Sequence, residues 1–317
     1  MREESATEIG VRRDVIPAIE LDHVSKHFDG VKAVDDLSLA VAPGRIFGLL
    51  GPNGAGKTST IRMMLGIMIP DSGAVRMFGA PLGRRSLGQA GYLPEERGLY
   101  AKMTARENLV FFGQLCGLDA AGARRKAEAW TERLGIEQRL DDKVEELSKG
   151  MQQKIQFIAT VIHDPAFIVM DEPFTGLDPI NVNQLKSVLS DLRAKGRAIV
   201  FSTHRTDQIE QLCDSICLMN HGRSVLQGSV REIRSGYGTH FVEIEYDGGG
   251  SFLDGNPLID SYDRHADYVE VRLKAGADAQ ALLRSALVCS RIRRFEIKEA
   301  TIEQIFIDLM SRRDGDG

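Results

Sequence analysis

Residues 46–59 read IFGLLGPNGAGKTS, and this stretch decides the fold. A short apolar run typical of a buried strand leads into the pattern G-x-x-x-x-G-K-[ST], and an amphipathic segment expected to be helical to about Met68 follows. Glycines allow successive backbone N–H groups to turn toward one anion, and the start of a helix adds partial positive charge. This order of strand, loop and helix predicts a phosphate-binding site. Its expected lining residues are Gly51, Pro52, Asn53, Gly54, Ala55, Gly56, Lys57, Thr58 and Ser59.

The chemistry of a phosphate loop assigns roles to its last residues and requires a carboxylate elsewhere in the chain. The Lys57 ammonium can reach the β- and γ-phosphates of a nucleotide, and the Thr58 hydroxyl can ligate Mg²⁺. The apolar run Phe167–Met170 leads directly into two acids, Asp171 and Glu172. Because adjacent residues at a strand end point to opposite sides, we expect Asp171 to hold Mg²⁺ beside Thr58 and Glu172 to polarise an attacking water.

The pattern of apolar residues predicts an α/β domain with a parallel sheet over residues 17–228. Further short apolar runs lie at 198–202 and 215–219, and segments with helical periodicity alternate with such runs. A helical insertion is expected at about residues 101–163, where a capping box, Thr104-x-x-Glu107, opens its first helix. Residues 1–16 are polar and are expected to form a mobile tail.

After residue 228 the pattern changes. Phe241–Tyr246 and Tyr268–Leu273 alternate apolar and charged residues, as half-buried antiparallel strands do. Helical periodicity returns at 277–287 and 301–309, with a further alternating run between them. We therefore expect residues 229–317 to form a small α+β accessory domain with the element order ββαβα.

The composition limits the possible functions. The chain has 317 residues, with 40 Lys and Arg against 45 Asp and Glu, a formal net charge of −5. This acidic balance argues against a protein that coats nucleic acid. No apolar run reaches the roughly 18 residues that cross a bilayer, and the N-terminus lacks the apolar core of a signal peptide, so we expect a cytoplasmic location. The four cysteines lack metal-ligand spacing and are expected to be reduced, mostly core residues.

Residues Leu147–Lys154 read LSKGMQQK, which resembles the signature, usually LSGGQ, of the ATP-binding subunits of ABC transporters. The motifs follow the family's order across about residues 18–228. The resemblance implies a P-loop ATPase core with an antiparallel β subdomain and a helical insertion. It also implies a head-to-tail dimer in which Ser148 and Gly150 of one chain contact the ATP held by the phosphate loop of the other.

Three more positions resemble functional residues of the family. Gly176-Leu-Asp178-Pro resembles the loop that crosses the dimer interface. His204 resembles the switch histidine that contacts the γ-phosphate and holds Glu172 and the water in line. Phe28 matches the aromatic residue that stacks on adenine. On their own, these positions would indicate a turn, a polar surface residue and a core residue.

The sequence departs from the family's pattern at three positions. Glu95 stands where the lid glutamine is expected. A carboxylate can ligate Mg²⁺ more strongly than an amide does, but it adds negative charge beside the γ-phosphate. Lys149 replaces the first glycine of the signature, where it is suited to attract the partner's phosphates, and Met151 replaces the glutamine.

The resemblance implies a subunit that hydrolyses ATP with Mg²⁺ and powers a separate membrane-spanning partner at the cytoplasmic face. On binding ATP it would dimerise with a second copy or with another ATPase subunit. Residues 229–317 resemble the extra domain of a drug- and sodium-export type subgroup, which favours an exporter. Two alternatives remain open: a soluble ATPase of the same superfamily in translation or DNA maintenance, and a nucleotide-gated binding module with little hydrolysis.

Overall fold

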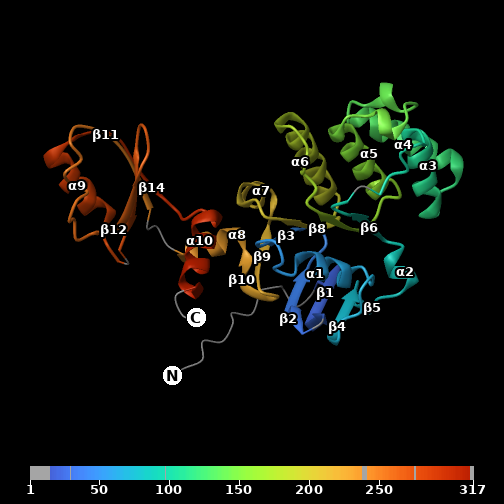
Figure 1. Ribbon diagram of the computed structural model, residues 1–317, viewed down its shortest axis with the longest axis horizontal. Coiled ribbons are helices and arrows are strands. Elements are labelled where there is room, and N and C mark those ends of the chain that lie inside the picture. Colours follow the sequence, from blue (N-terminus) through green and yellow to red (C-terminus); the bar gives the residue numbers. More distant parts are fainter. Residues whose placement is uncertain (1–14, 29, 97, 238–240, 275, 315–317) are drawn as a thin grey trace. The chain divides into compact units, whose positions relative to one another are not determined.

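The computed structural model describes residues 15–28, 30–96, 98–237, 241–274 and 276–314, with only the backbone for 310–314. The chain divides after Gly228 into two compact units (Figure 1). Each unit is described here by itself. Of the expected N-terminal tail, residues 1–16, all but Val15 and Ile16 lie outside the described residues.

The first unit is built on a six-stranded sheet with the strand order β10-β9-β3-β8-β7-β6. Its strands are β3 (Ile46–Leu50), β6 (Ala90–Leu93), β7 (Phe167–Asp171), β8 (Ala198–Thr203), β9 (Ser215–Asn220) and β10 (Arg223–Ser229). The pairs β3–β8, β3–β9, β7–β8 and β6–β7 are parallel. Every residue of β3, β7 and β8 is buried, which explains why these strands are short continuous apolar runs. The expected parallel α/β core is confirmed.

A second, antiparallel sheet with the order β2-β1-β4-β5 forms the β subdomain. Its strands are β1 (Ile19–Phe28), β2 (Val31–Val41), β4 (Ser72–Met77) and β5 (Ala80–Pro81). Apolar side chains of this sheet share one core with β3, β7 and helix α1 (Lys57–Met64). This shared core fixes the end of β1, which carries Phe28, relative to the helix that carries Lys57 and Thr58.

Helix α1 is shorter than the sequence predicts. It ends at Met64, and Gly66 then adopts a left-handed φ of 62°, which turns the chain before the expected end at Met68. The apolar spacing that suggested a longer helix is still explained by packing, because Met68 lies against the same core. The other helices of the core are α2 (Arg84–Leu87), α6 (Pro179–Ala194) and α7 (Thr206–Leu212).

A helical insertion joins β6 to β7. It contains α3 (Ala105–Leu115), α4 (Ala120–Arg133), the 3₁₀ turns η1 (Glu137–Arg139) and η2 (Val144–Glu146), and α5 (Lys149–Val161). Figure 1 shows these green helices gathered beyond the β6 end of the six-stranded sheet. The expected capping box is present, because the Glu107 backbone N–H donates to the Thr104 hydroxyl and the Glu107 carboxylate accepts from the Thr104 N–H.

The second unit contains a four-stranded antiparallel sheet with the order β12-β13-β11-β14. Its elements are α8 (Val230–Tyr237), β11 (Phe241–Asp247), β12 (Ile259–Arg264), β13 (Val269–Leu273), α9 (Ala279–Cys289), β14 (Arg291–Lys298) and α10 (Ile302–Asp314). The expected order ββαβα is therefore wrong, since α8 and β12 were missed. Only Ile259 is buried in β12, so this edge strand lacks the alternation that reveals the others.

The second unit has its own apolar core between the sheet and α9, which includes Val242, Ile244, Val271 and Leu282. Across the described residues, no helix is both long and apolar enough to cross a bilayer. The four cysteines are free. Cys213 and Cys217 are buried, whereas Cys116 and Cys289 are exposed, so the expectation that most are core residues holds for only half of them.

Candidate nucleotide site

The loop between β3 and α1 is held in the tight curl that its sequence predicts. Gly54 and Gly56 have φ angles of 79° and 104°, which side chains rarely tolerate, and a Cβ on Gly56 would lie 2.3 Å from the Ala33 carbonyl oxygen. The Lys57 side chain is only 7 % exposed. Its Nζ donates to the carbonyl oxygens of Gly51 at 2.8 Å and Pro52 at 3.0 Å. The loop thus encircles one buried ammonium group.

The electrostatics around Lys57 agree with a site for phosphate and metal. Burial lowers the pKa of the Lys57 ammonium, because the charged form loses solvation. The three carboxylates whose charges oppose this effect are, in order of size, those of Glu172, Asp171 and Glu95. All three are among the acidic residues that the sequence singled out. Glu95 itself is exposed, in the turn that follows β6.

Thr58 and Asp171 come together at the end of β7. The Thr58 hydroxyl donates to Oδ2 of Asp171 at 2.9 Å, and the Ser202 hydroxyl donates to the other carboxylate oxygen. Asp171 is 2 % exposed. Hydroxyl and carboxylate oxygens are the ligands that Mg²⁺ prefers, so this pair fits the expected metal. No group of three or more His, Cys, Asp or Glu side chains suited to hold a metal occurs in the part of the chain described.

Glu172 lies just beyond β7, and its backbone conformation differs from that of the strand. Its φ is 50°, in the left-handed region, so alternation along a strand does not explain why it diverges from Asp171. The sequence argument is wrong in this detail, because the turn at Glu172 separates the two carboxylates. Oε1 of Glu172 accepts the backbone N–H of His204 at 3.1 Å and lies 2.7 Å from its ring Nδ1, while Oε2 accepts from the Thr203 hydroxyl at 3.4 Å. Glu172 and His204 therefore form one unit.

Phe28 stands at the end of β1 and is 44 % exposed, so it is not a core residue. The Lys26 ammonium lies 5.7 Å from the centre of its ring. Asp71 fixes this strand end by accepting from Lys26 Nζ and from the His27 backbone N–H, both at 2.7 Å. These two bonds, with the Lys26 bond the larger cause, lower the pKa of Asp71 to about 2. Asp71 was not found from the sequence, because its partners lie more than 40 residues earlier.

Ser148 and Gly150 open helix α5. The Ser148 hydroxyl caps the helix by accepting the Met151 N–H at 3.3 Å. A Cβ on Gly150 would meet its nearest neighbour, Leu177, at an ordinary 3.8 Å, so packing within the chain does not require glycine there. Asp178 caps α6 by accepting the Asn181 N–H at 2.9 Å, and this bond is the main cause of its lowered pKa. Within the chain, Ser148 and Asp178 thus act as helix caps. A contact with a second chain would be a further role of the same residues.

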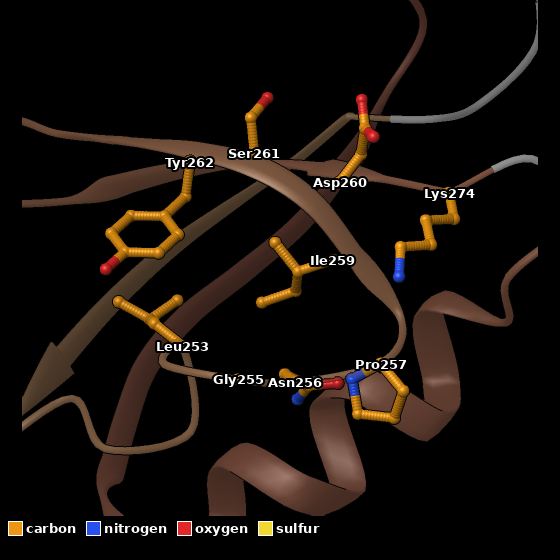
Figure 2. A pocket seen from close by; sticks show the side chains of 9 residues that line it. All are labelled: Leu253, Gly255, Asn256, Pro257, Ile259, Asp260, Ser261, Tyr262 and Lys274. Carbon is orange, nitrogen blue, oxygen red and sulfur yellow. The ribbon is translucent and has the colours of Figure 1, made fainter.

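The second unit contains a hollow of about 400 Å³ beside β12 (Figure 2). Asp260 and Lys274 lie toward one end of the view, and Tyr262 and Leu253 toward the other. None of the residues predicted from the sequence lines this hollow. The residues predicted to bind phosphate and metal and to activate water lie in the first unit, near the ends of β3, β7 and β8.

Comparison with known proteins agrees with this geometry. The sequence model described as ABC transporter matches residues 34–175, and the one described as ATP-binding protein DrrA1-3-like, C-terminal domain, matches residues 228–310. An ABC transporter ATP-binding protein of Bacillus subtilis (strain 168), YhaQ, is 41 % identical over 92 % of this chain and 97 % of its own length. The Nod factor export ATP-binding protein I of Paraburkholderia xenovorans (strain LB400) is 38 % identical over 85 % of this chain and 93 % of its own.

A solved structure described as the ATP-binding subunit of an ABC transporter superposes with a TM-score of 0.65. It is 31 % identical in sequence and covers 69 % of this chain and 93 % of its own. The extent of this match agrees with a shared ATP-binding core, to which the second unit of this chain is added.

Proposed function

The chain belongs to the family of ABC transporter ATP-binding proteins, and we propose that it hydrolyses ATP to ADP and phosphate to power a separate membrane-spanning exporter. One relative is named for the export of Nod factor, and the second unit matches the C-terminal domain of a DrrA-like ATP-binding protein. These likenesses support export as the direction of transport. They do not identify the molecule that is transported.

The proposed reaction is an in-line attack of water on the γ-phosphate. Glu172 orients the water and accepts its proton as the bond between the γ-phosphorus and the leaving oxygen breaks. The Lys57 ammonium stabilises the charge on the β- and γ-phosphates, together with the backbone N–H groups of the loop. Thr58 and Asp171 would hold Mg²⁺, which neutralises phosphate charge when it is bound. Glu95 is proposed as a further ligand from the turn after β6.

His204 is proposed as the residue that couples Glu172 to the γ-phosphate. Because a carboxylate can only accept hydrogen bonds, Nδ1 of the His204 ring is the donor to Glu172, and Nε2, on the other side of the ring, would donate to the phosphate when it also carries a proton. Phe28 would stack on adenine through its exposed ring, an interaction worth about 1–3 kcal/mol for each base. The exposed position of the ring is the observation that supports this role over that of a core residue.

We propose that ATP closes a head-to-tail dimer of two copies, or of this chain with a second ATPase subunit. Ser148 and Gly150 of one copy would then bind the nucleotide of the other, and Asp178 would lie at the interface. The space beside Gly150 supports this arrangement, because the nearest atom among the described residues would lie 3.8 Å from a Cβ there, an ordinary contact that does not demand a glycine. Hydrolysis would reopen the dimer and move the membrane partner.

The observation that carries the proposal is the grouping of Glu172 with His204 beside the bonded pair of Thr58 and Asp171. The test is a steady-state ATPase assay of the purified chain with Mg²⁺, compared with the same assay in EDTA. Release of phosphate that requires both ATP and Mg²⁺ is expected. Tight ATP binding without turnover would favour a nucleotide-gated binding module. A membrane protein that co-purifies with the chain would identify the partner.

A further inference from the structure

Helix α5 is bonded along the free edge of β6. In the sheet as formed by the described residues, β6 is a terminal strand, and β7 is its neighbour there. The Gln89 carbonyl accepts from the Phe167 N–H, so the carbonyls of residues 91 and 93 face β7 and those of 90, 92 and 94 face away from it. An unpaired strand edge of this kind needs other donors.

Side chains on one stripe of α5 and just after it supply these donors. Nε2 of His163 lies 3.2 Å from the Ala90 carbonyl oxygen, and the Thr160 hydroxyl is shared between the Tyr92 carbonyl at 3.2 Å and the Gln156 carbonyl of its own helix at 3.0 Å. The Gln156 side-chain amide donates to the carbonyls of Pro94 and Glu96, both at 3.1 Å. The spacing 156, 160 and 163 places the three side chains on one helical face. The helix thus follows the strand and continues past its end, into the turn that carries Glu95.

The contact between α5 and β6 is unusually close. A Cβ on Gly91 would lie 2.3 Å from the backbone oxygen of Thr160, so the helix and strand meet without a side chain between them at this point. Gln156 and Thr160 are buried, at 4 % and 5 % exposure. Because buried hydrogen bonds are poorly replaced by water, these donors hold the strand more firmly than surface contacts would.

We propose that Gln156 is a positioning residue for Glu95. Its amide bonds the carbonyl before Glu95 and the carbonyl after it, so it fixes the backbone on both sides of that carboxylate. This fixes the direction in which Glu95 approaches the phosphate loop, where its charge already acts on Lys57. The proposal rests on the proposed function, since it gives Glu95 a task at the metal and phosphate site.

The test compares Gln156→Met, which keeps the length of the side chain but removes the donors, with the native chain. Hydrogen–deuterium exchange of the peptide containing Glu95 should become at least about 10-fold faster in the nucleotide-free variant, because the backbone of the turn loses both bonds. The affinity for Mn²⁺, titrated by electron paramagnetic resonance with a non-hydrolysable ATP analogue, should fall by about 10-fold. Gln184→Met is the matched control: this glutamine of α6 donates to the carbonyl of Arg133 at 3.3 Å, at the end of α4 rather than in the Glu95 turn, and its loss should leave Mn²⁺ affinity unchanged.

Two further variants decide the mechanism. In a Glu95→Ala background, Gln156→Met should cause no additional loss of Mn²⁺ affinity, because its effect passes through Glu95. Gln156→Lys, which again has a donor of similar reach, should restore part of the exchange protection. Unchanged exchange in Gln156→Met, or an equal loss of affinity with and without Glu95, would overturn the proposal. If the native chain binds no Mn²⁺–nucleotide, the proposed function fails. The exchange experiment would still test whether Gln156 holds the backbone on both sides of Glu95.

Discussion

The ring Nδ1 of His204 lies 2.7 Å from Oε1 of Glu172, and the backbone N–H of His204 donates to the same oxygen at 3.1 Å. Two groups of one residue therefore hold one carboxylate oxygen. This pairing restrains both the position of the carboxylate and the rotation of the imidazole ring. The other oxygen lies 3.4 Å from the Thr203 hydroxyl, which also donates to Gln208 at the shorter distance of 2.9 Å, so it is the oxygen more available to a water molecule.

Glu172→Gln should separate nucleotide binding from hydrolysis. The amide keeps the size of the side chain but lacks the basicity, so the rate of hydrolysis should fall by about 10²-fold or more. ATP binding should persist, and the variant should accumulate as an ATP-bound dimer. An ATPase assay measures the first effect, and size-exclusion chromatography with MgATP measures the second. A native rate of hydrolysis would refute the role of Glu172. An inactive monomer with ATP bound would count against the closed dimer.

Lys57→Ala should weaken ATP binding or abolish turnover while the fold remains. The change removes the ammonium that the loop surrounds and leaves the carbonyls of Gly51 and Pro52 without their donor. Fluorescence titration with ATP and circular dichroism measure the two properties. Lys195→Ala, at the exposed C-terminus of α6, removes an equal charge and should have no effect. Unchanged ATPase activity in a folded Lys57→Ala variant would eliminate the phosphate-loop assignment.

Asp71→Ala should raise the Kd for ATP by about 3- to 10-fold, because it releases the strand end that positions Phe28 for stacking. The affinity for inorganic triphosphate should not change, since that ligand has no base. The control is Asp22→Ala, which removes an exposed carboxylate paired with Arg76 on the same sheet. An equal loss of affinity for ATP and triphosphate would show that Asp71 acts on the phosphate site instead.

The lowered pKa of Asp71 gives this contact a defined pH range. The pKa falls from 3.8 to about 2 in the folded chain, so the carboxylate and its bonds are present above pH 4 and are lost as the pH falls through 2. The Asp71 contribution to ATP affinity should therefore stay constant between about pH 8 and 9, above the range in which histidines such as those near this strand end ordinarily change charge. A difference between native and Asp71→Ala affinities that varies across this range would contradict the assignment.

Gly91→Ala should destabilise the first unit by about 1–3 kcal/mol, the usual cost of forcing atoms into a filled space. The added methyl group would overlap the Thr160 backbone oxygen, which cannot move without shifting α5. Chemical denaturation measures the effect. Gly98→Ala is the control, because a Cβ there meets no atom within 4 Å. Equal stability of the two variants would show that α5 yields easily at this contact.

Truncation after Ser229 should leave ATP binding intact. The cut keeps all of β10, and strands β11–β14 with α9, which follow it, form their own apolar core. The predicted site residues all precede it in the chain. Titration of the truncated chain with ATP checks this expectation. A folded truncation that no longer binds ATP would show that residues 230–317 help to build the site.

The sequence predicted those parts of the fold in which local pattern and burial agree. The runs at 46–50 and 167–170 are fully buried strands, and the Thr104–Glu107 capping box is complete in the structure. Strand β12 was missed because an edge strand with one buried residue has no apolar alternation. Helix α1 was drawn too long because Met68 packs on the core after the helix has ended.

The candidate site divides in the same way. The motifs identified the residues whose side chains can bind phosphate and metal. Thr58 and Asp171 are indeed hydrogen-bonded, although they lie 113 residues apart in the sequence. The residues that hold Phe28 and Glu95 in place could not be found, because Asp71 and Gln156 act through hydrogen bonds to groups far away in sequence. Such bonds need one suitable side chain and no particular neighbour, so they have no local sequence pattern. The left-handed turn at Glu172 was likewise invisible, since glutamate rarely adopts it.

The two outer strands of the sheet in the second unit, β12 and β14, bear on solubility. Strand β12 carries Asp260, Asp263 and Arg264 and breaks its register between Ile259 and Ser261, while β14 carries Arg291, Arg293, Arg294 and Lys298. Charges and irregular register are the features that keep an exposed strand from pairing with strands of other molecules. The sheet thus ends at both sides in strands that discourage aggregation. A fragment of residues 229–317 should consequently stay dispersed at the high concentrations that spectroscopy requires.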